Sequence, residues 1–382
     1  MTTPLARRLR ARIAIEGPLT VAAFMAEALA HPQHGYYMRR DPFGRQGDFT
    51  TAPEISQTFG ELLGLWCADL WQRAGAPAPV RLVEIGPGRG TLLADAWRAA
   101  GVLPVFREAA RLHLVEISPA LRAVQRATLA AAGVPEPAWH DALADLPDGP
   151  ILLIANELFD ALPVHQFQRT EAGWRERLVD ADAEDGNGED AGGFRFVLAR
   201  QGAPLAALIP EAVRPAPVGS VAEVSPAAIS LAAEIGGRVA AQGGAALIVD
   251  YGPAESGPGD TLQALRRHRR HDPLADPGEA DLTAHVDFAT LARAAGEAGA
   301  RIHGPTPQGA FLRRLGIEAR LQALLRRATP AQAADLAVGV RRLIAPEEMG
   351  TLFKVLAAAH PAWPAPAGFE DASPVTASGT RA

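Results

Sequence analysis

The sequence predicts an α/β fold built on a mostly parallel β-sheet, and three observations support this prediction. From residue 80 onward, short apolar segments alternate with segments of helical periodicity, as strands and helices do in parallel α/β proteins. The segment 151–155 is apolar throughout, which is typical of a strand buried on both faces. The glycine-rich segment 86–90 directly follows an apolar strand. We therefore expect a ligand site beyond the carboxyl ends of the strands.

Residues 1–78 are predicted to form an N-terminal helical region that packs on the sheet. Helical patterns run over residues 4–15 and 20–30, and a loop is expected at 31–37. The first pattern has apolar residues on one face and arginines on the other. This arrangement is typical of a helix that lies on a core.

A further helix is expected from about Pro53 to Arg73. Thr51 and Glu54 match the capping box S/T-x-x-E, in which the hydroxyl and the acid each bond to a backbone N–H at the helix start. The sequence therefore predicts that Thr51 caps this helix.

Residues 79–363 are predicted to form the sheet domain, with an insertion at about 164–224. The insertion interrupts the alternation, because its strands are expected to be antiparallel around an acidic loop at 180–190. The tail 364–382 is rich in Pro, Ala and Ser and is expected to be disordered. The strands of the sheet are expected at 80–85, 111–117, near Trp139, at 151–155, 245–249 and 352–356.

The composition of the 382 residues indicates a globular protein. A formal net charge of −6 argues against a protein that coats nucleic acid. Six acids lie in the loop 180–190, and the acids and bases outside it are equal in number. Cys67 is the single cysteine, so neither an intrachain disulfide nor a cysteine-based zinc site is expected. No apolar run approaches the roughly 18 residues of a membrane span, and the oligomeric state stays open.

The most specific local pattern surrounds the glycine loop. Glu84 is followed by Gly86, Gly88 and Gly90, and a helix is expected from Thr91. A dinucleotide site would have glycine at the position of Thr91, as the last residue of G-x-G-x-x-G. The pattern E-x-G-x-G-x-G instead resembles motif I of class I S-adenosylmethionine methyltransferases. An acid such as Glu84 suits a ligand that carries an ammonium and a sulfonium, although a structural glycine turn is the alternative.

Two further acids are candidates for contacts with a nucleoside. Glu116 ends the second strand, where a carboxylate can accept hydrogen bonds from both ribose hydroxyls. NAD enzymes use the same arrangement, so Glu116 does not choose between the two cofactors. Asp141 follows the third strand and could contact the adenine amino group, or it could be a solvated loop carboxylate.

A polar cluster follows the apolar strand 151–155. Asn156, Glu157 and Asp160 are expected near the reacting group, because they lie at the carboxyl end of a buried strand. Unpaired polar groups in such a place are costly, so they need a reason. A capped helix start would explain any single one of them. Asp250 has the same position after the strand 245–249.

In these and other motifs, the chain resembles the MidA-type methyltransferases, the family of mitochondrial complex I assembly factor 7 and its bacterial relatives. The matching stretches occur in order along most of the chain, and the set is far more specific than any one of them. They are residues 31–37, 47–56, 84–90, 156–163, 250–252, 260–262, 281–288 and 349–354.

The resemblance implies a class I methyltransferase fold, with helices on both faces of the sheet and an added region that covers the substrate. It implies S-adenosyl-L-methionine as the cofactor, with Thr51 and Pro53 closing over it. The implied activity is methylation of arginine in a protein, and for the mitochondrial member it is symmetric dimethylation of a complex I subunit. A respiratory-chain subunit is thus one candidate partner. The compartment would be the cytoplasm of a bacterium, or the mitochondrial matrix in a eukaryote.

The chemistry of arginine methylation points to particular carboxylates. A guanidinium stays protonated at ordinary pH, with a pKa above about 12. Carboxylates that pair with its fork can localise the charge, and one can accept the departing proton. Glu157 and Asp160 are the candidates, Asp250 is the third, and Asn156 lies beside them.

A metal site is not expected, because methyl transfer needs none. His268, His271, Asp272 and neighbouring residues fit no standard zinc spacing. His285 and Asp287 are expected to line the substrate cleft or to cap the following helix.

Alternative functions stay open at this point. A small-molecule methyltransferase is one, and a non-catalytic assembly factor that kept the fold is another. Intact ligand-type residues around the glycine loop argue against the latter. An NAD-binding oxidoreductase is disfavoured by Thr91.

Overall fold

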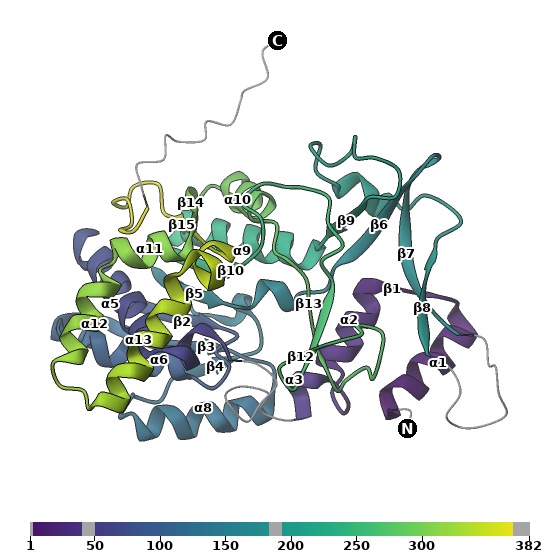
Figure 1. Ribbon diagram of the computed structural model, residues 1–382. Coiled ribbons are helices and arrows are strands. Elements are labelled where there is room, and N and C mark those ends of the chain that lie inside the picture. Colours follow the sequence, from purple (N-terminus) through teal and green to yellow (C-terminus); the bar gives the residue numbers. More distant parts are fainter. Residues whose placement is uncertain (1–2, 40–49, 183–192, 370–382) are drawn as a thin grey trace, which may run out of the picture.

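The computed structural model describes residues 3–39, 50–182 and 193–369 and shows two lobes (Figure 1). The first, here called the sheet lobe, holds a seven-stranded sheet with helices on both faces. The second, here called the cover lobe, holds the N-terminal helices and two smaller sheets. Figure 1 shows the sheet lobe on the left and the cover lobe on the right.

The seven-stranded sheet has the order β14-β15-β10-β5-β2-β3-β4. The pairs from β10 to β4 are all parallel, whereas β15 pairs antiparallel with both β10 and β14. The predicted mostly parallel sheet is therefore confirmed. Its strands are β2 (Val80–Ile85), β3 (Ala110–Val115), β4 (Ala138–His140), β5 (Ile151–Asn156), β10 (Gly244–Tyr251), β14 (Arg301–Pro307) and β15 (Phe353–Ala359).

Helices cover both faces of this sheet, as predicted. Helices α5, α6 and α11–α13 pack on one face, and α9 and α10 pack on the other. None of the helices in the described part of the chain has the length and apolar character that a membrane span requires. The helices of this lobe are α4 (Ala52–Ile55), α5 (Gln57–Arg73), α6 (Thr91–Ala100), α7 (Pro104–Ala109), α8 (Pro119–Ala131), α9 (Pro226–Gln242), α10 (Phe288–Glu297), α11 (Gln308–Arg314), α12 (Ile317–Leu325) and α13 (Pro330–Ile344), with short turns η1 (Leu143–Asp145), η2 (Phe159–Ala161) and η4 (Pro346–Gly350).

Strand β5 lies at the centre of the sheet and explains why its sequence is apolar throughout. Leu152 and Ile154 point into the core under α5 and α6, whereas Leu153 and Ala155 point into the core under α9 and α10. Full burial of each Leu or Ile side chain stabilises the fold by about 1.5–3 kcal/mol. The expectation of a strand buried on both faces is confirmed.

The cover lobe is assembled from three separate parts of the chain. Helices α1 and α2 share an apolar core with strands of both smaller sheets. One sheet has the order β1-β7-β6-β9 with β8 paired to β7, and the other has the order β12-β11-β13. The elements are α1 (Pro4–Glu16), β1 (Leu19–Thr20), α2 (Val21–Ala30), α3 (Tyr36–Arg39), β6 (His165–Thr170), β7 (Gly173–Ala181), β8 (Phe194–Leu198), η3 (Pro204–Leu208), β9 (Val221–Val224), β11 (Gln263–Arg266), β12 (Arg269–His271) and β13 (Asp281–Thr283).

The structure divides the predicted N-terminal region 1–78 between the two lobes. Strand β1 pairs antiparallel with β7, so α1 and α2 belong with the inserted strands. Helix α5 instead packs against α6 in the sheet lobe. The strands of the predicted insertion 164–224 share the core of the cover lobe with β11 and β13, which lie outside the predicted range. The predicted loop 31–37 runs into the one-turn helix α3.

The predictions for the C-terminal tail and for the acidic loop are each tested only in part, because some of their residues lie outside the described residues. The predicted disordered tail 364–382 begins with a packed stretch, because Trp66 Nε1 donates to the carbonyl of Ala367 at 3.1 Å and Phe369 contacts Phe311. Residues 370–382 lie outside the described residues. The antiparallel strands around 180–190 are confirmed as β7 and β8, whereas most of the acidic loop between them lies outside the described residues.

Candidate active site

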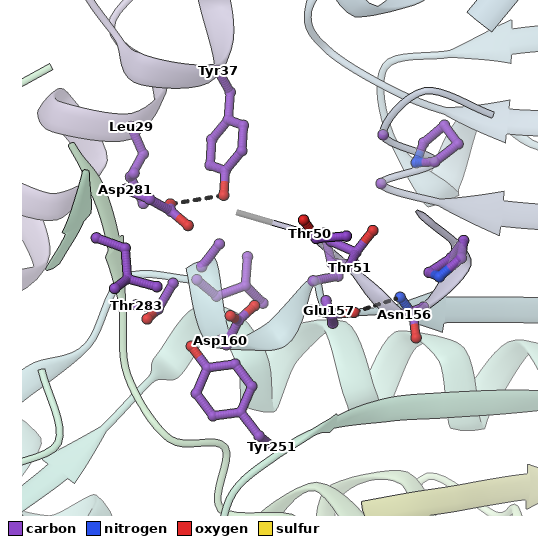
Figure 2. A pocket seen from close by; sticks show the side chains of 18 of the residues that line it. Leu29, Tyr37, Thr50, Thr51, Asn156, Glu157, Asp160, Tyr251, Asp281 and Thr283 are labelled. Atoms are coloured by element: carbon purple, nitrogen blue, oxygen red, sulfur yellow. Dashed lines mark hydrogen bonds between the residues drawn. The ribbon is translucent and has the colours of Figure 1, made fainter. Parts of the chain in front are cut away.

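A cavity of about 780 Å³ lies between the carboxyl edge of the large sheet and the cover lobe. Its walls come from the glycine loop after β2, the turn after β5, helix α3 and the strands β11 and β13. Figure 2 shows Tyr37 and Asp281 approaching from one side, with Asp160 and Glu157 opposite. The predicted position beyond the strand ends therefore coincides with a cavity, and the cover lobe forms part of its wall.

The glycine loop turns through a backbone conformation that favours glycine. Gly86, Gly88 and Gly90 have φ angles of 65°, 51° and 82°, a region that costs other residues energy. A Cβ on Gly86 would lie 2.8 Å from Leu158 Cδ1, the end of a flexible side chain that can move, so the positive φ is the main reason for glycine there. Gly86 and Gly88 line the cavity, whereas Gly90 caps helix α6 and is not on its wall.

Glu84 is a buried acid on the cavity wall without a charged partner. Its side chain is 4% exposed, and its Oε2 atom has no hydrogen-bond partner among the described residues. Burial raises the pKa of Glu84 to about 8, although a hydrogen bond from the backbone N–H of Leu93 opposes the shift. A buried, unpaired carboxyl oxygen of this kind suits a cationic ligand group.

Glu116 is held in place by neutral donors. Its Oε1 atom accepts the N–H of Ser118 at 2.8 Å, and its Oε2 atom accepts Gln125 Nε2 at 3.1 Å. Gln125 also donates to the carbonyl of Gly88 at 2.9 Å and accepts Trp139 Nε1 at 2.8 Å. Burial raises the pKa of Glu116. Gln125 thus ties the glycine loop to Glu116, a role that its place in a helical pattern did not reveal.

Asp141 lies away from the cavity wall. Its side chain is 80% exposed and pairs with Arg122 at 2.7 Å. Of its two sequence interpretations, the structure places it as a solvated loop carboxylate beside β4. Asp141 is not among the described residues that line the cavity, where the cofactor is expected.

Glu157 sits at the end of β5 in an unusual backbone conformation. Its φ is 49°, which non-glycine residues adopt mainly where the surroundings enforce it. Its Oε1 atom accepts the N–H of Ala52 at 2.8 Å and Asn156 Nδ2 at 3.3 Å. Burial raises the pKa of Glu157 to about 7, and the neighbouring Asp160 adds to the shift. The Oδ1 atom of Asn156 has no partner among the described residues.

Asp160 faces the same cavity one turn further on. It is 6% exposed, and the side chain of Tyr251 lies beside it (Figure 2) and helps to hold its charged form. Burial raises the pKa of Asp160 to about 6. Tyr251 was not predicted, although it directly follows Asp250 at the end of β10.

Asp250 has a structural task rather than a place on the cavity wall. Its Oδ2 atom accepts the N–H groups of Leu158, Phe159 and Asp160 at 2.9–3.2 Å, and its Oδ1 atom accepts the N–H of Tyr251 at 2.9 Å. The side chain is fully buried. The hypothesis that Asp250 is a third proton acceptor is therefore corrected, because backbone donors occupy both of its oxygens.

The capping box predicted at Thr51 and Glu54 is wrong. Thr51 makes no side-chain cap bond, the chain breaks into two helices, and Ser56 caps the second by accepting the N–H of Thr58. Glu54 instead accepts the Thr91 hydroxyl and lies 3.5 Å from Arg89. These contacts fasten α4 onto the glycine loop. Thr51 and Pro53 both line the cavity, as their predicted role beside the cofactor requires.

The cover lobe contributes polar groups that sequence reasoning missed. The hydroxyl of Tyr37 donates to Asp281 Oδ1 at 2.8 Å, and both residues line the cavity. Both lie in stretches that support the family resemblance, but neither follows a strand of the large sheet. His285 lines the cavity and Asp287 caps α10, as expected. Among the described residues no cluster of three or more His, Cys, Asp or Glu could hold a metal ion.

Known proteins are similar to this chain in the sequence and the fold that carry this site. A model of a family of S-adenosyl-L-methionine-dependent methyltransferases matches residues 62–306. That range contains Glu84, Glu116, Glu157 and Asp160. A crystal structure of a Burkholderia thailandensis protein bound to S-adenosyl-homocysteine is similar with a TM-score of 0.79 and 33% identity, covering 96% of this chain and 93% of that chain.

Curated relatives are similar over nearly the whole chain. The protein named "Protein arginine methyltransferase NDUFAF7 homolog, mitochondrial" from Drosophila melanogaster is 42% identical over 379 residues, covering 92% of this chain and 84% of that protein. The protein named "Protein arginine methyltransferase NDUFAF7, mitochondrial" from Mus musculus is 42% identical over 377 residues, covering 93% and 84%. The Homo sapiens protein of the same name is 40% identical over 383 residues, covering 93% and 83%.

Proposed function

The chain belongs to the family of S-adenosyl-L-methionine-dependent methyltransferases, and from this premise we propose that it methylates arginine side chains of a protein substrate. S-adenosyl-L-methionine is its cofactor, and when bound it supplies a methyl group carried on a positively charged sulfur. The residues of the cavity fit such a ligand. The unpaired oxygen of Glu84 suits its ammonium group, and the carboxylate of Glu116 suits its ribose hydroxyls.

One observation carries the proposal of an arginine substrate. Glu157 and Asp160 lie together on the cavity wall, Glu157 partly buried and Asp160 buried, and neither forms an ion pair with a basic side chain among the described residues. The charge of Arg342 opposes the rise in the pKa of Glu157, but Arg342 does not pair with it. Two neighbouring carboxyl groups that lack an ion-paired cation repel each other and lose hydration. A guanidinium would supply both the missing charge and a fork of N–H donors that matches carboxylates.

The two carboxylates are assigned different tasks. Glu157 is fixed by bonds from Ala52 and Asn156 to its Oε1 atom, so Oε2 is the oxygen that we assign to the guanidinium. With a pKa near 7 it can also hold the proton that the nucleophilic nitrogen must lose. Asp160 is oriented by Tyr251 and would bind a second N–H of the fork, which localises positive charge away from the reacting nitrogen.

The names of the relatives support a protein substrate. The curated relatives are named protein arginine methyltransferases and mitochondrial, and the family resemblance makes a respiratory complex I subunit the first substrate to test. We place the protein in the compartment of that substrate. This is the cytoplasm in a bacterium and the mitochondrial matrix in a eukaryotic cell.

A label-transfer experiment tests the proposed function. Lysate from cells that lack the protein is incubated with the purified enzyme and methyl-labelled S-adenosyl-L-methionine, and the labelled proteins are hydrolysed to amino acids. We expect the label in methylarginine, with Glu157→Gln as the inactive control. Label in lysine, or only in small molecules, would contradict the proposal, and the latter would favour a small-molecule methyltransferase.

A further inference from the structure

The mouth of the cavity carries a basic hairpin, defined here as residues 263–271. It comprises β11, a two-residue turn and β12, and it ends in the run Arg-Arg-His-Arg-Arg-His. Four of its residues line the cavity, namely Gln263, Leu265, His268 and Arg270. Arg270 and His268 are also exposed, so they lie where the cavity opens to solvent.

The two faces of the hairpin differ in what they meet. Leu265 pairs with Arg270 in the strand register, and both line the cavity. Arg266 pairs with Arg269 on the other face, where Arg266 is bound to Asp276 at 2.6 Å. Neither Arg269 nor Arg270 has an acidic partner within ion-pair distance in the described part of the chain. The hairpin thus presents one open arginine to the cavity and one away from it.

The turn of the hairpin is built from unfavourable residues. Arg267 and His268 have φ angles of 52° and 60°, as the two central residues of a type I′ turn require. Such turns strongly prefer Asn-Gly, because a side chain at positive φ is strained. Strain of this kind is typical of functional sites, where the side chain itself is needed.

A second cation faces the cavity from the other lobe. Arg342 on α13 lines the cavity and is exposed, and it has no acidic partner among the described residues. The interior of the cavity is acidic, with Glu157, Asp160 and Asp281 on its walls. Exposed basic residues of both lobes therefore border an acidic interior.

From this charge pattern we propose that the basic hairpin docks an acidic segment of the protein substrate next to the target arginine. The proposal rests on the proposed function, and it specifies which arginines are accepted. The target side chain enters the acidic interior, while carboxylates of its sequence neighbours pair with Arg270 and His268. Lysine or arginine neighbours are repelled at the same place, which gives specificity by repulsion as well as by attraction.

Peptides that differ only beside the arginine test this proposal. Each carries one arginine, flanked by glutamate, glutamine or lysine. For the wild-type enzyme we expect kcat/KM to fall in that order, with roughly tenfold or more between the glutamate and lysine peptides. The difference should lie in KM and shrink at high salt, because exposed charges are screened. A wild-type enzyme indifferent to the flanking charge would overturn the proposal.

Two neighbouring arginines provide matched variants. Arg270→Glu should abolish or reverse the preference. Arg270→Gln should remove most of the preference, and it replaces Arg270→Glu as the test if the reversal of charge disturbs folding. Arg269→Glu is the control, with the same change of charge on the other face of the same strand, and it should keep the order. His268→Gly should weaken the preference without lowering the unfolding temperature, because glycine accepts the positive φ. Equal effects of Arg269→Glu and Arg270→Glu would overturn the proposal.

Binding measurements separate this proposal from the proposed function. The cofactor-loaded protein is titrated into fluorescein-labelled glutamate-flanked peptide, and anisotropy is followed for the wild type and both variants. If no arginine peptide is methylated, the proposed function fails, yet binding that is lost only in Arg270→Glu still supports docking. Weaker binding of S-adenosyl-L-methionine by Arg270→Glu in calorimetry would assign Arg270 to the cofactor instead. Tighter binding of an RNA oligonucleotide than of the acidic peptide would also overturn the proposal.

Discussion

The pKa values of the carboxyl groups of Glu84, Glu157 and Asp160 are all raised, and the main cause is the same for each. Burial raises their pKa values to about 8, 7 and 6, because the charged form loses hydration. Each group would gain most from a cation placed against it. Acids with perturbed pKa values that line one cavity are typical of functional sites. Here Glu84 lies beside the glycine loop, whereas Glu157 and Asp160 lie in the turn after β5.

Replacing Glu157 by glutamine tests the assigned proton acceptor. We expect kcat to fall at least about 100-fold, the lower range for loss of a general base, while calorimetric affinity for S-adenosyl-L-methionine changes little. Glu171→Gln, in the exposed turn between β6 and β7, is the matched control and should keep full activity. Full turnover by Glu157→Gln would remove this residue from the mechanism.

Glu84 should make the stability of the cofactor-free protein depend on pH. Its pKa rises from 4.5 in the unfolded chain to about 8 in the folded protein, so between these values the folded state binds the extra proton. The stabilisation is complete below pH 4.5 and is lost as pH rises through 8. Urea unfolding at a series of pH values should show a smaller decline for Glu84→Gln than for the wild type. Identical declines would show that Glu84 does not titrate as described.

Sequence reasoning located most acids at the site but missed several of their partners. Glu84, Glu116, Glu157 and Asp160 could be predicted because they end buried parallel strands, whose carboxyl ends share one edge. Gln125, Tyr37 and Asp281 could not, because their places depend on the packing of helices and of the cover lobe. Asp141 shows the limit of the rule, since it follows β4 and still points to solvent.

At the scale of elements, the turn after β5 depends on one buried carboxylate. Asp250 receives three consecutive backbone N–H groups of the turn and a fourth from Tyr251. An asparagine must turn its NH₂ group toward one of these donors. We expect Asp250→Asn to lower the free energy of unfolding by about 1–3 kcal/mol and to lower kcat more than the affinity for S-adenosyl-L-methionine. A variant with wild-type stability and kcat would contradict this positioning role.

The start of α5 gives a second test at this scale. Ser56 caps the helix, so Ser56→Ala should reduce the free energy of unfolding by about 1 kcal/mol. Thr51→Ala should cost less, because Thr51 makes no side-chain cap bond. Chemical denaturation of both variants decides between the two caps, and a larger loss for Thr51→Ala than for Ser56→Ala would restore the predicted capping box.

The two caps also show why local patterns were only partly reliable. Strand β5 was predicted well, because a strand buried on both faces consists of apolar residues without interruption. Residues 51–54 match the capping-box sequence, but the Glu54 carboxylate contacts Thr91 and Arg89 at the glycine loop instead of the backbone at the helix start. A tertiary contact therefore overrides a local pattern, and it does so at the wall of the cavity.

At the scale of the whole molecule, the cover lobe explains how a common sheet becomes a deep site. Strand β1 pairs with β7, which lies about 160 residues further along the chain, and the shared core joins α1 and α2 to β11 and β13 through Ala264 and Leu282. No local pattern predicts such pairings. The sheet domain and the separate helices and antiparallel strands of the covering region could thus be predicted from the sequence, whereas the assembly of these parts into one lobe could not.

The assigned roles place the cofactor at the glycine loop and a substrate guanidinium at Glu157 and Asp160, within one cavity. A crystal structure with S-adenosyl-homocysteine and a glutamate-flanked arginine peptide tests this arrangement most directly. We expect the ammonium group against Glu84 and the guanidinium against Glu157 Oε2 and Asp160, with one of its nitrogens facing the sulfur. An arginine side chain bound elsewhere, with Glu157 and Asp160 unoccupied, would contradict the account.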